Sequence, residues 1–382
     1  MTLFSFAIPP VLGYFLVALL AVSRQTHTIR VALWPAVTFF AYRAAVSVDM
    51  SSQYPDTRYY NSHFVGFMVF IIIRTFDWSL EKEPLSRALH PAKGSRPVII
   101  DALDLATTMR GQGWDWSHGV HIPRETRPTD RTGFTYHVIS SAVLHSIICG
   151  VFSSAIRSFS PRGLGAPSGG SIFDETLPFY VWYPRACVIS LFAAFTVYSA
   201  IQSLYDICTI IGVLIFQQDP ARWPPAFDAP WRATSLRDLW GRRWHQFFRR
   251  TFLIQGGYPL SFILGKAGIA IGSFISSAVF HHVAVLSLND RAEAWRMVVG
   301  FGMMAPGIIA EEAFRQLTGR KVGGVVGWAW TLAWFTVWGN MIIDAFARGG
   351  VFGHLELVDR AVPGRAVIHG LVTNFDAWLR TM

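Results

Sequence analysis

The chain has 382 residues, of which 52% are hydrophobic and only 15% are charged, and its formal net charge is +9 at pH 7. Soluble domains carry about a quarter charged residues, so this composition excludes an ordinary soluble enzyme and predicts a membrane protein. The basic residues lie in loops between apolar runs, which argues against a nucleic-acid partner. The cysteines Cys149, Cys187 and Cys208 lie in apolar runs without metal-ligand spacing, so we expect neither a metal site nor a disulfide framework.

Apolar runs long enough to cross a bilayer divide the chain, at about 20 residues per span. They lie at about 6–22, 31–49, 62–76, 136–157, 185–216, 267–288, 294–314 and 324–347. We interpret the first run as a retained span, because no basic region with a small-residue cleavage site accompanies it. The sequence therefore predicts an all-α fold, a polytopic bundle of about 8–9 transmembrane helices. These helices are expected to form a single membrane-embedded domain over residues 1–382.

Some of these segments do not fit a simple span. The run 185–216 is too long for one perpendicular helix, so a tilt or a break near Gln202–Asp206 is expected. The apolar stretch 251–265 contains two glycines and a proline, and we interpret it as a re-entrant or interfacial piece. The C-terminal segment 350–382 mixes apolar and charged residues, which is typical of an amphipathic helix on the membrane surface.

Polar segments at 77–133, 158–183 and 217–250 separate the runs. The first and third of these are rich in arginine, and the positive-inside rule predicts that they face the cytoplasm. The segment 158–183 is rich in glycine, serine and proline, and it is predicted to be flexible.

The arginine-rich segment from Arg232 to Arg250 lies beside the start of a predicted span. Ser235 or the preceding threonine is a candidate N-cap, and the apolar spacing from Leu236 onward predicts an amphipathic helix. Asp238 and Arg242 are four residues apart, a favourable ion-pair spacing. One interpretation is an interfacial helix with a basic headgroup face. The other is a docking helix for an anionic cofactor, because guanidinium groups match phosphate oxygens.

Two adjacent histidines, His281 and His282, lie inside an otherwise apolar span. Ionisable groups are costly there and functional by default, and a neutral imidazole accepts a proton near neutral pH. The alternative is a histidine satisfied by a hydrogen bond between helices. Neighbouring helix positions point about 100° apart, so one metal ion would not easily reach both rings. Other polar groups within apolar runs, which either line a passage or pair with arginine, are His145, Asp206, Glu311, Glu312, Asn340 and Asp344.

These features together resemble the wax synthase-like branch of the membrane-bound O-acyltransferases. The run Ser-Leu-X-Asp-Phe-Trp-Gly-Arg-Arg-Trp of that family reads here from Ser235 to Trp244, with Leu239 in place of phenylalanine. In the family, a buried histidine follows some tens of residues later, a position that His281 matches. The run Met109–Trp116 is similar to an Arg-Gly-X-Gly-Trp-X-Trp signature of fungal terpenoid acetyltransferases. The wax synthase-like core would cover about 217–320, and His282 departs from the glutamate found in many relatives.

The resemblance implies acyl transfer from a coenzyme A thioester to a hydroxyl group in the endoplasmic reticulum membrane. His281 would be the general base, with His282 as the alternative, and Ser277 is a candidate donor to the oxyanion. No cofactor would be bound permanently, since the acyl-CoA is a co-substrate. Its expected contacts are Arg237, Asp238, Trp240, Arg242, Arg243, Trp244, His245 and Ser277.

The fungal signature favours acetyl-CoA as the donor and a lipophilic terpenoid or meroterpenoid alcohol of secondary metabolism as the acceptor. The lipid bilayer would be the remaining partner, and the sequence does not predict an oligomeric state. One alternative is a wax ester synthase that joins long-chain acyl-CoA to fatty alcohols. A different class, a multi-pass transporter with the histidines as a proton relay, would more often show broken spans in two related halves.

Overall fold

The computed structural model describes residues 3–51, 57–87, 97–117, 119–289, 292–355, 362 and 364–381. Apart from one antiparallel bridge between Arg87 and Trp114, these residues form helices, turns and loops, which confirms the predicted all-α fold. The chain divides into two compact units. Unit 1 comprises Met1–Val120 and Gln246–Ser287, and unit 2 comprises His121–His245 and Leu288–Met382.

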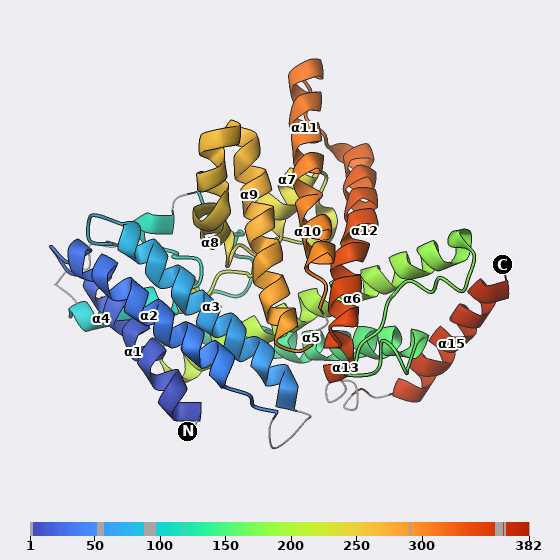
Figure 1. Ribbon diagram of the computed structural model, residues 1–382, viewed down its shortest axis with the longest axis horizontal. Helices are drawn as coiled ribbons and strands as arrows, with labels where there is room; N and C mark the ends of the chain where they lie inside the picture. Colours follow the sequence, from blue (N-terminus) through green and yellow to red (C-terminus); the bar gives the residue numbers. More distant parts are fainter. Residues whose placement is uncertain are drawn as a thin grey trace. The chain divides into compact units, whose positions relative to one another are not determined.

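Unit 1 is built on its first three long helices, which are consecutive in the sequence and pack against one another (Figure 1). Tyr14, Met68 and Trp78 are among the buried residues of its apolar core, which also holds the small side chains of the first two helices. The helices of unit 1 are α1 (Leu3–Ala21), α2 (His27–Ser47), α3 (Arg58–Leu80), α4 (Val98–Thr107), η2 (Asp115–Ser117), α8 (Arg249–Phe252), η7 (Leu253–Gly257) and α9 (Tyr258–Leu286).

The segment from α8 to α9 is a helical hairpin that turns at Gly265 (Figure 1). Gly265 has φ +57°, a left-handed conformation that side chains disfavour, so the chain reverses there. Gly272, on the second leg, lies so close to Gly256 that a Cβ would overlap the facing backbone. The first leg, of about 16 residues at 1.5 Å each, is too short to cross a bilayer. The re-entrant or interfacial placement of 251–265 stays a prediction.

Unit 2 pairs two long helices, α5 and α6, and stacks α12 on the helix pair α10 and α11. Of the two alternatives for the run 185–216, a tilt or a break near Gln202–Asp206, the break is wrong. The helix α6 continues through these residues and changes only afterwards to the wider π-helix η3. The helices of unit 2 are α5 (Arg131–Phe159), α6 (Phe179–Ile210), η3 (Ile211–Ile215), η4 (Pro220–Arg222), η5 (Pro230–Arg232), α7 (Leu236–Asp238), η6 (Leu239–Arg243), α10 (Ala294–Gly302), α11 (Met304–Thr318), α12 (Gly324–Arg348), α13 (Val351–His354) and α15 (Arg365–Thr381).

The fully buried carboxylate of Asp344 holds the end of α12 and the loop between α5 and α6 together. Its Oδ2 pairs with Arg296 at 2.7 Å and with Arg348 at 2.9 Å. Its Oδ1 accepts hydrogen bonds from the Ser171 hydroxyl at 2.7 Å and from the Ile172 backbone at 2.9 Å. The expectation that this glycine-rich loop is flexible is therefore wrong, because a buried charge anchors its middle.

Seven helical segments among the described residues are long and apolar enough to cross a membrane. The helix α12, predicted as a further span, is 25 residues long but is not among them. Its four tryptophans lower its mean hydropathy. The chain is an integral membrane protein, and the seven segments found among its described residues are close to the predicted 8–9 spans. The apolar segments are Leu3–Ala21, His27–Ser47, Arg58–Leu80, Arg131–Phe159, Phe179–Ile215, Arg249–Leu286 and Ala294–Thr318.

The hairpin gives a test of the close glycine contact. Gly272→Ala places a methyl group against the Gly256 carbonyl, so we expect it to destabilise the protein by about 1–3 kcal/mol. Gly339→Ala is the matched control, because its Cβ meets no atom within 4 Å and alanine favours a helix. Thermal unfolding of the purified protein in detergent measures both, and equal stability of the two variants would contradict the close packing.

Candidate active site

The arginine-rich motif of unit 2 forms a short helical turn. The Ser235 side chain accepts a hydrogen bond from the backbone N–H of Asp238 at 2.9 Å, as expected of an N-cap. The helix α7 passes directly into the π-helix η6, and the chain is extended again at Trp244. The predicted amphipathic helix through Arg250 is therefore wrong, since helix resumes only at Arg249.

The π-helix changes which arginine pairs with Asp238. Asp238 binds Arg243 rather than Arg242, because the wider turn brings residues five apart onto one face. Arg243 also donates through Nη1 to the backbone carbonyl of Asp228 at 3.0 Å, and its own carbonyl accepts from the Asp228 N–H at 2.9 Å. Arg243 thus holds the preceding loop, in which Ala229 has an unusual φ of +43°.

A buried carboxylate on α11, outside the motif in the sequence, caps the N-terminal end of the motif. Glu311 accepts hydrogen bonds from the backbone N–H groups of Leu236 and Arg237, at 2.5 and 3.1 Å. It also accepts from the Trp330 indole at 3.0 Å. An anion at a helix N-terminus satisfies N–H groups that lack intrahelical partners. Gly307, one turn earlier on α11, leaves room for the Leu236 side chain.

Aromatic rings line the inner side of the motif. The ring centroid of Trp244 lies 5.1 Å from that of Phe227 and 6.0 Å from that of Trp240. His245 packs its ring against Phe227 at 5.6 Å, and Trp240 reaches Phe335 on α12 at 6.1 Å. These contacts fix Trp240, Trp244 and His245 within an aromatic cluster.

Two arginines of the motif point outward. Arg242 is exposed and forms no ion pair within the part of the chain that the structure describes. Arg237 is also exposed, with 62% of its side chain accessible, and pairs with Glu312 at 3.3 Å. Exposed guanidinium groups on a rigid turn can bind an incoming phosphate.

In unit 1, His281 has a defined orientation on α9. Its Nδ1 lies 2.8 Å from the backbone carbonyl oxygen of Ser277, one turn earlier on the same helix. A carbonyl oxygen only accepts hydrogen bonds, so Nδ1 must carry the hydrogen. In the neutral ring, the lone pair then resides on Nε2, the nitrogen that can take a proton.

Ser277 and His282, the polar neighbours of His281 on α9, have different surroundings. The Ser277 hydroxyl is buried and lies 3.4 Å from Nδ1 of His281, on the donor side of the ring. His282 is half-buried, and no side-chain hydrogen bond, ion pair or ring contact of it is found among the described residues. No group of three or more metal-ligating side chains gathers in those residues. The geometry therefore distinguishes His281 from His282.

The Met109–Trp116 run is a structured loop in unit 1. Gly111 has φ +64° and lies against the Trp116 ring, which leaves no space for a Cβ. The guanidinium groups of Arg74 and Arg250 lie 4.5 and 5.3 Å from the centroid of this ring. Arg250 also binds both oxygens of the buried Asp77, at 2.8 and 2.9 Å. Arg250, at the end of the arginine-rich segment, therefore acts as a structural anchor.

A sequence model described as the membrane bound O-acyl transferase family matches residues 223–303 of this chain. The match includes both the arginine-rich turn and His281. This stretch of the chain is therefore similar to the membrane-bound O-acyltransferases. The matched residues divide between unit 2, which holds 223–245 and 288–303, and unit 1, which holds 246–287.

Named relatives are fungal enzymes of modest similarity. An acetyltransferase from Rhodocybe pseudopiperita is 27% identical over 247 residues, 60% of this chain and 62% of that protein. An O-mevalon transferase from Aspergillus niger is 25% identical over 166 residues, 42% and 37% of the two chains. Another O-mevalon transferase, from Penicillium terrestre, is 25% identical over 316 residues, 70% and 69%. The chain spans less than two thirds of the length of the first two.

Sequence reasoning missed the residues that support the arginine-rich turn. Glu311 was only one of several intramembrane polar candidates, and its capping role depends on a contact 75 residues away in the chain. Arg127 likewise donates to the backbone carbonyl of Trp223, at the start of the matched segment. The sequence shows a carboxylate or an arginine beside an apolar run, which indicates that the side chain needs a partner. It does not indicate which residue that partner is.

The capping carboxylate gives the second prediction. Glu311→Ala leaves two backbone N–H groups and the Trp330 indole without their acceptor, so we expect a loss of about 1–3 kcal/mol in stability for each orphaned group. Glu312→Ala is the control, because that neighbouring carboxylate forms exposed ion pairs. Limited proteolysis between residues 228 and 245, together with thermal unfolding, measures the effect. Equal protection of both variants would refute the cap.

Proposed function

We propose that this protein is an O-acetyltransferase that transfers the acetyl group of acetyl-CoA to a hydroxyl of a lipophilic terpenoid or meroterpenoid alcohol. The family match at 223–303 supports acyl transfer to oxygen. The observation that carries the proposal is the hydrogen bond from His281 Nδ1 to the Ser277 carbonyl, because it orients a neutral base.

The chemistry needs a base more than any other group. A thioester is already activated, whereas an alcohol is a weak nucleophile until its proton is removed. In the proposed step, Nε2 of His281 takes the hydroxyl proton as the oxygen attacks the thioester carbon, and a C–O bond forms. The C–S bond then breaks, and the imidazolium returns its proton to the departing thiolate. A positioned general base of this kind contributes about 10²–10⁴ in rate.

The Ser277 hydroxyl lies on the Nδ1 side of the imidazole. The alcohol in the proposed step meets Nε2, on the other side of the ring. We therefore favour Ser277 as an orienting group for His281 over the expected role as oxyanion donor. His282 remains the alternative base, which only a variant can exclude.

Coenzyme A is polyanionic, so its binding requires cations outside the apolar bundle. The exposed Arg242 and Arg237 are the proposed phosphate contacts. Arg243 and Asp238 support the turn rather than bind directly, since they pair with each other. Trp240, Trp244 and His245 form the aromatic layer behind the turn, where they maintain its shape.

The relatives' names support the donor, whereas the terpenoid acceptor is inferred from the resemblance of the Met109–Trp116 run. These names divide between acetyltransferases and O-mevalon transferases, so the transferred group differs within the family. Acetyl is proposed because the first of these relatives is named an acetyltransferase. Residence in the endoplasmic reticulum is part of the same proposal. A wax ester synthase remains the alternative within the family.

A donor competition tests the proposed reaction. Microsomes that carry the protein receive labelled acetyl-CoA or palmitoyl-CoA, each with a terpenoid alcohol and a fatty alcohol. We expect labelled acetate ester of the terpenoid alcohol, because the proposed enzyme uses the short donor. Predominant palmitoyl ester of the fatty alcohol would instead favour the wax ester synthase. Solute flux without consumption of either thioester would indicate a transporter.

The base assignment gives a separate prediction. His281→Ala removes the proton acceptor, so kcat should fall by about 10²–10⁴ while KM for acetyl-CoA changes little. His282→Ala is the matched control on the same helix, and it should retain most of the activity. Product formation measured by mass spectrometry gives both values.

Thermal unfolding of the two variants shows whether each is folded. A folded His281→Ala protein with unchanged kcat would exclude His281 as the base. Loss of activity only in His282→Ala would transfer that role to His282.

A further inference from the structure

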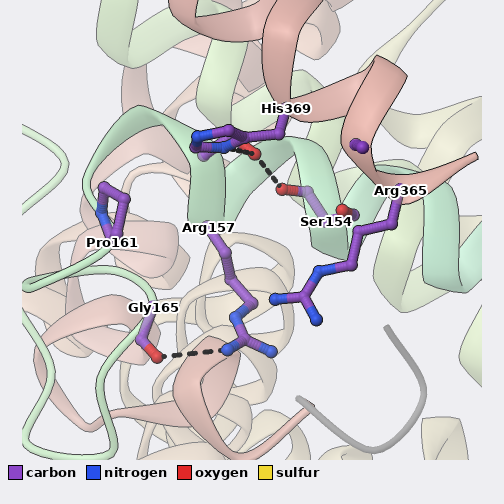
Figure 2. A pocket seen from close by; sticks show the side chains of 8 residues that line it. Ser154, Arg157, Pro161, Gly165, Arg365 and His369 are labelled. Carbon is purple, nitrogen blue, oxygen red and sulfur yellow. Dashed lines mark hydrogen bonds between the residues drawn. The ribbon is translucent and has the colours of Figure 1, made fainter. Parts of the chain in front are cut away.

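The C-terminal helix α15 packs against one end of the α5–α6 pair in unit 2 (Figure 1). The Nδ1 of His369 lies 3.1 Å from the Ser158 hydroxyl oxygen, in the last turn of α5 (Figure 2). Asp376 pairs with Arg185, which lies in the second turn of α6. The helices α5 and α6 are consecutive membrane spans, so the end of one and the start of the next lie at the same membrane surface. These contacts therefore place α15 near that surface.

The first side of α15 faces the protein and is held by a buried ion pair. The Oδ1 of Asp376 accepts a hydrogen bond from Nε of Arg185 at 2.6 Å, and both side chains are buried. Arg185 also donates through Nη2 to the Phe159 carbonyl at 2.9 Å. Val372, one turn before Asp376, is buried on the same side. Because separating a buried charge from its partner is costly, this ion pair fixes which side of α15 faces α5 and α6.

A second side of α15 carries large apolar side chains that remain exposed. At about 100° per residue, they form one stripe directed away from Val372 and Asp376. The stripe consists of Val367 (65% exposed), Leu371 (66%), Phe375 (37%) and Trp378 (54%). Phe375 lies at its edge, where its ring centroid is 6.4 Å from that of Phe159. The stripe therefore begins at the protein and continues outward from it.

A third side of α15 carries small and polar residues and completes the circumference of the helix. They are Gly370, Thr373, Asn374, Ala377 and Thr381. In water alone, a helix would bury its apolar stripe and expose only polar residues, and in lipid alone it would be apolar on all exposed sides. A helix with one apolar and one polar exposed side is suited to the boundary between the two.

The length of α15 and its tryptophan agree with this boundary. The helix has 17 residues, fewer than the roughly 20 that cross a bilayer, and it is not among the membrane-crossing segments found in the described residues. Trp378 lies at one end of the stripe, and tryptophan is enriched at membrane–water interfaces.

We infer that α15 lies in the plane of the membrane surface, with its apolar stripe against the acyl chains of the lipids and its small, polar side toward water. The helix cannot leave this depth without exposing the stripe to water. Through the Asp376–Arg185 ion pair, α15 therefore anchors the adjoining ends of α5 and α6 at the surface. This role is independent of the proposed acyl transfer, because α15 lies outside the family-matched segment 223–303.

The test measures how fast a water-soluble reagent reaches each side of α15. Leu371→Cys places a thiol on the apolar stripe, and Ala377→Cys places one on the polar side as the matched control. Both positions are exposed, so neither substitution should disturb the fold. The full-length proteins are reconstituted into phosphatidylcholine nanodiscs, in which both membrane surfaces are accessible, and treated with a polyethylene glycol maleimide. Wild type measures the background from Cys149, Cys187 and Cys208.

We expect Leu371→Cys to react about tenfold or more slowly than Ala377→Cys, because a reactive thiolate is disfavoured in apolar surroundings. After denaturation in detergent, the two variants should react equally. Equal rates in nanodiscs would overturn the inference, since the stripe would then lie in water. Slow reaction of both variants would also overturn it, because the polar side must reach water.

A second arm tests whether another copy of the chain covers the stripe instead of lipid. Leu371→Cys in native membranes is oxidised with copper phenanthroline and analysed on a non-reducing gel, with Ala377→Cys as the control. We expect the Leu371→Cys protein to remain monomeric. A disulfide-linked dimer specific to Leu371→Cys would overturn the assignment of lipid as the partner.

Discussion

The carboxylate of Glu311 holds the arginine-rich turn in place, and the candidate donor site depends on that contact. A turn of eight residues has too few internal hydrogen bonds to persist alone, since most of its N–H and C=O groups lie in its end turns. Glu311 supplies acceptors for two of those N–H groups from α11. The exposed Arg237 and Arg242 are consequently presented on a fixed backbone rather than on a mobile loop.

The same rule governs the other ionisable groups inside the apolar helices. Asp344 has two arginine partners, and Asp77 is bound through both oxygens by Arg250. A charge removed from water costs several kcal/mol unless ion pairs and hydrogen bonds replace its hydration, so each of these carboxylates organises the segments around it. Asp344 and Asp77 therefore have a structural role in the segments that they join.

Hydropathy predicts most of the fold, because every helix that crosses a bilayer needs about 20 mainly apolar residues. The run 136–157, for example, corresponds to α5 (Arg131–Phe159). The predicted run 62–76 is too short, because Asp77 marks the start of a polar segment in the sequence, whereas α3 continues to Leu80. Asp77 remains in the helix because its carboxylate pairs with Arg250. This arginine lies 173 residues away in the sequence. No local pattern contains that information.

The candidate site was predictable in its residue types and not in its pairings. The spacing of Asp238 and Arg242 favoured an ion pair in an α-helix, but the π-turn gives the partner role to Arg243. The pattern marked His281 and His282 equally, and only the coordinates give one of them a defined hydrogen bond. Which residues carry out the reaction remains a prediction, since geometry shows orientation and not turnover.

The group that orients His281 is part of the main chain. Every residue that keeps α9 helical offers the same carbonyl oxygen at position 277, whatever its side chain. Natural variation at this position can therefore proceed without disturbing the tautomer of the ring. If an aspartate or glutamate side chain oriented the ring, that residue would be recognisable in related sequences. Here a backbone carbonyl of the helix accepts the hydrogen bond, so a sequence comparison would not reveal it.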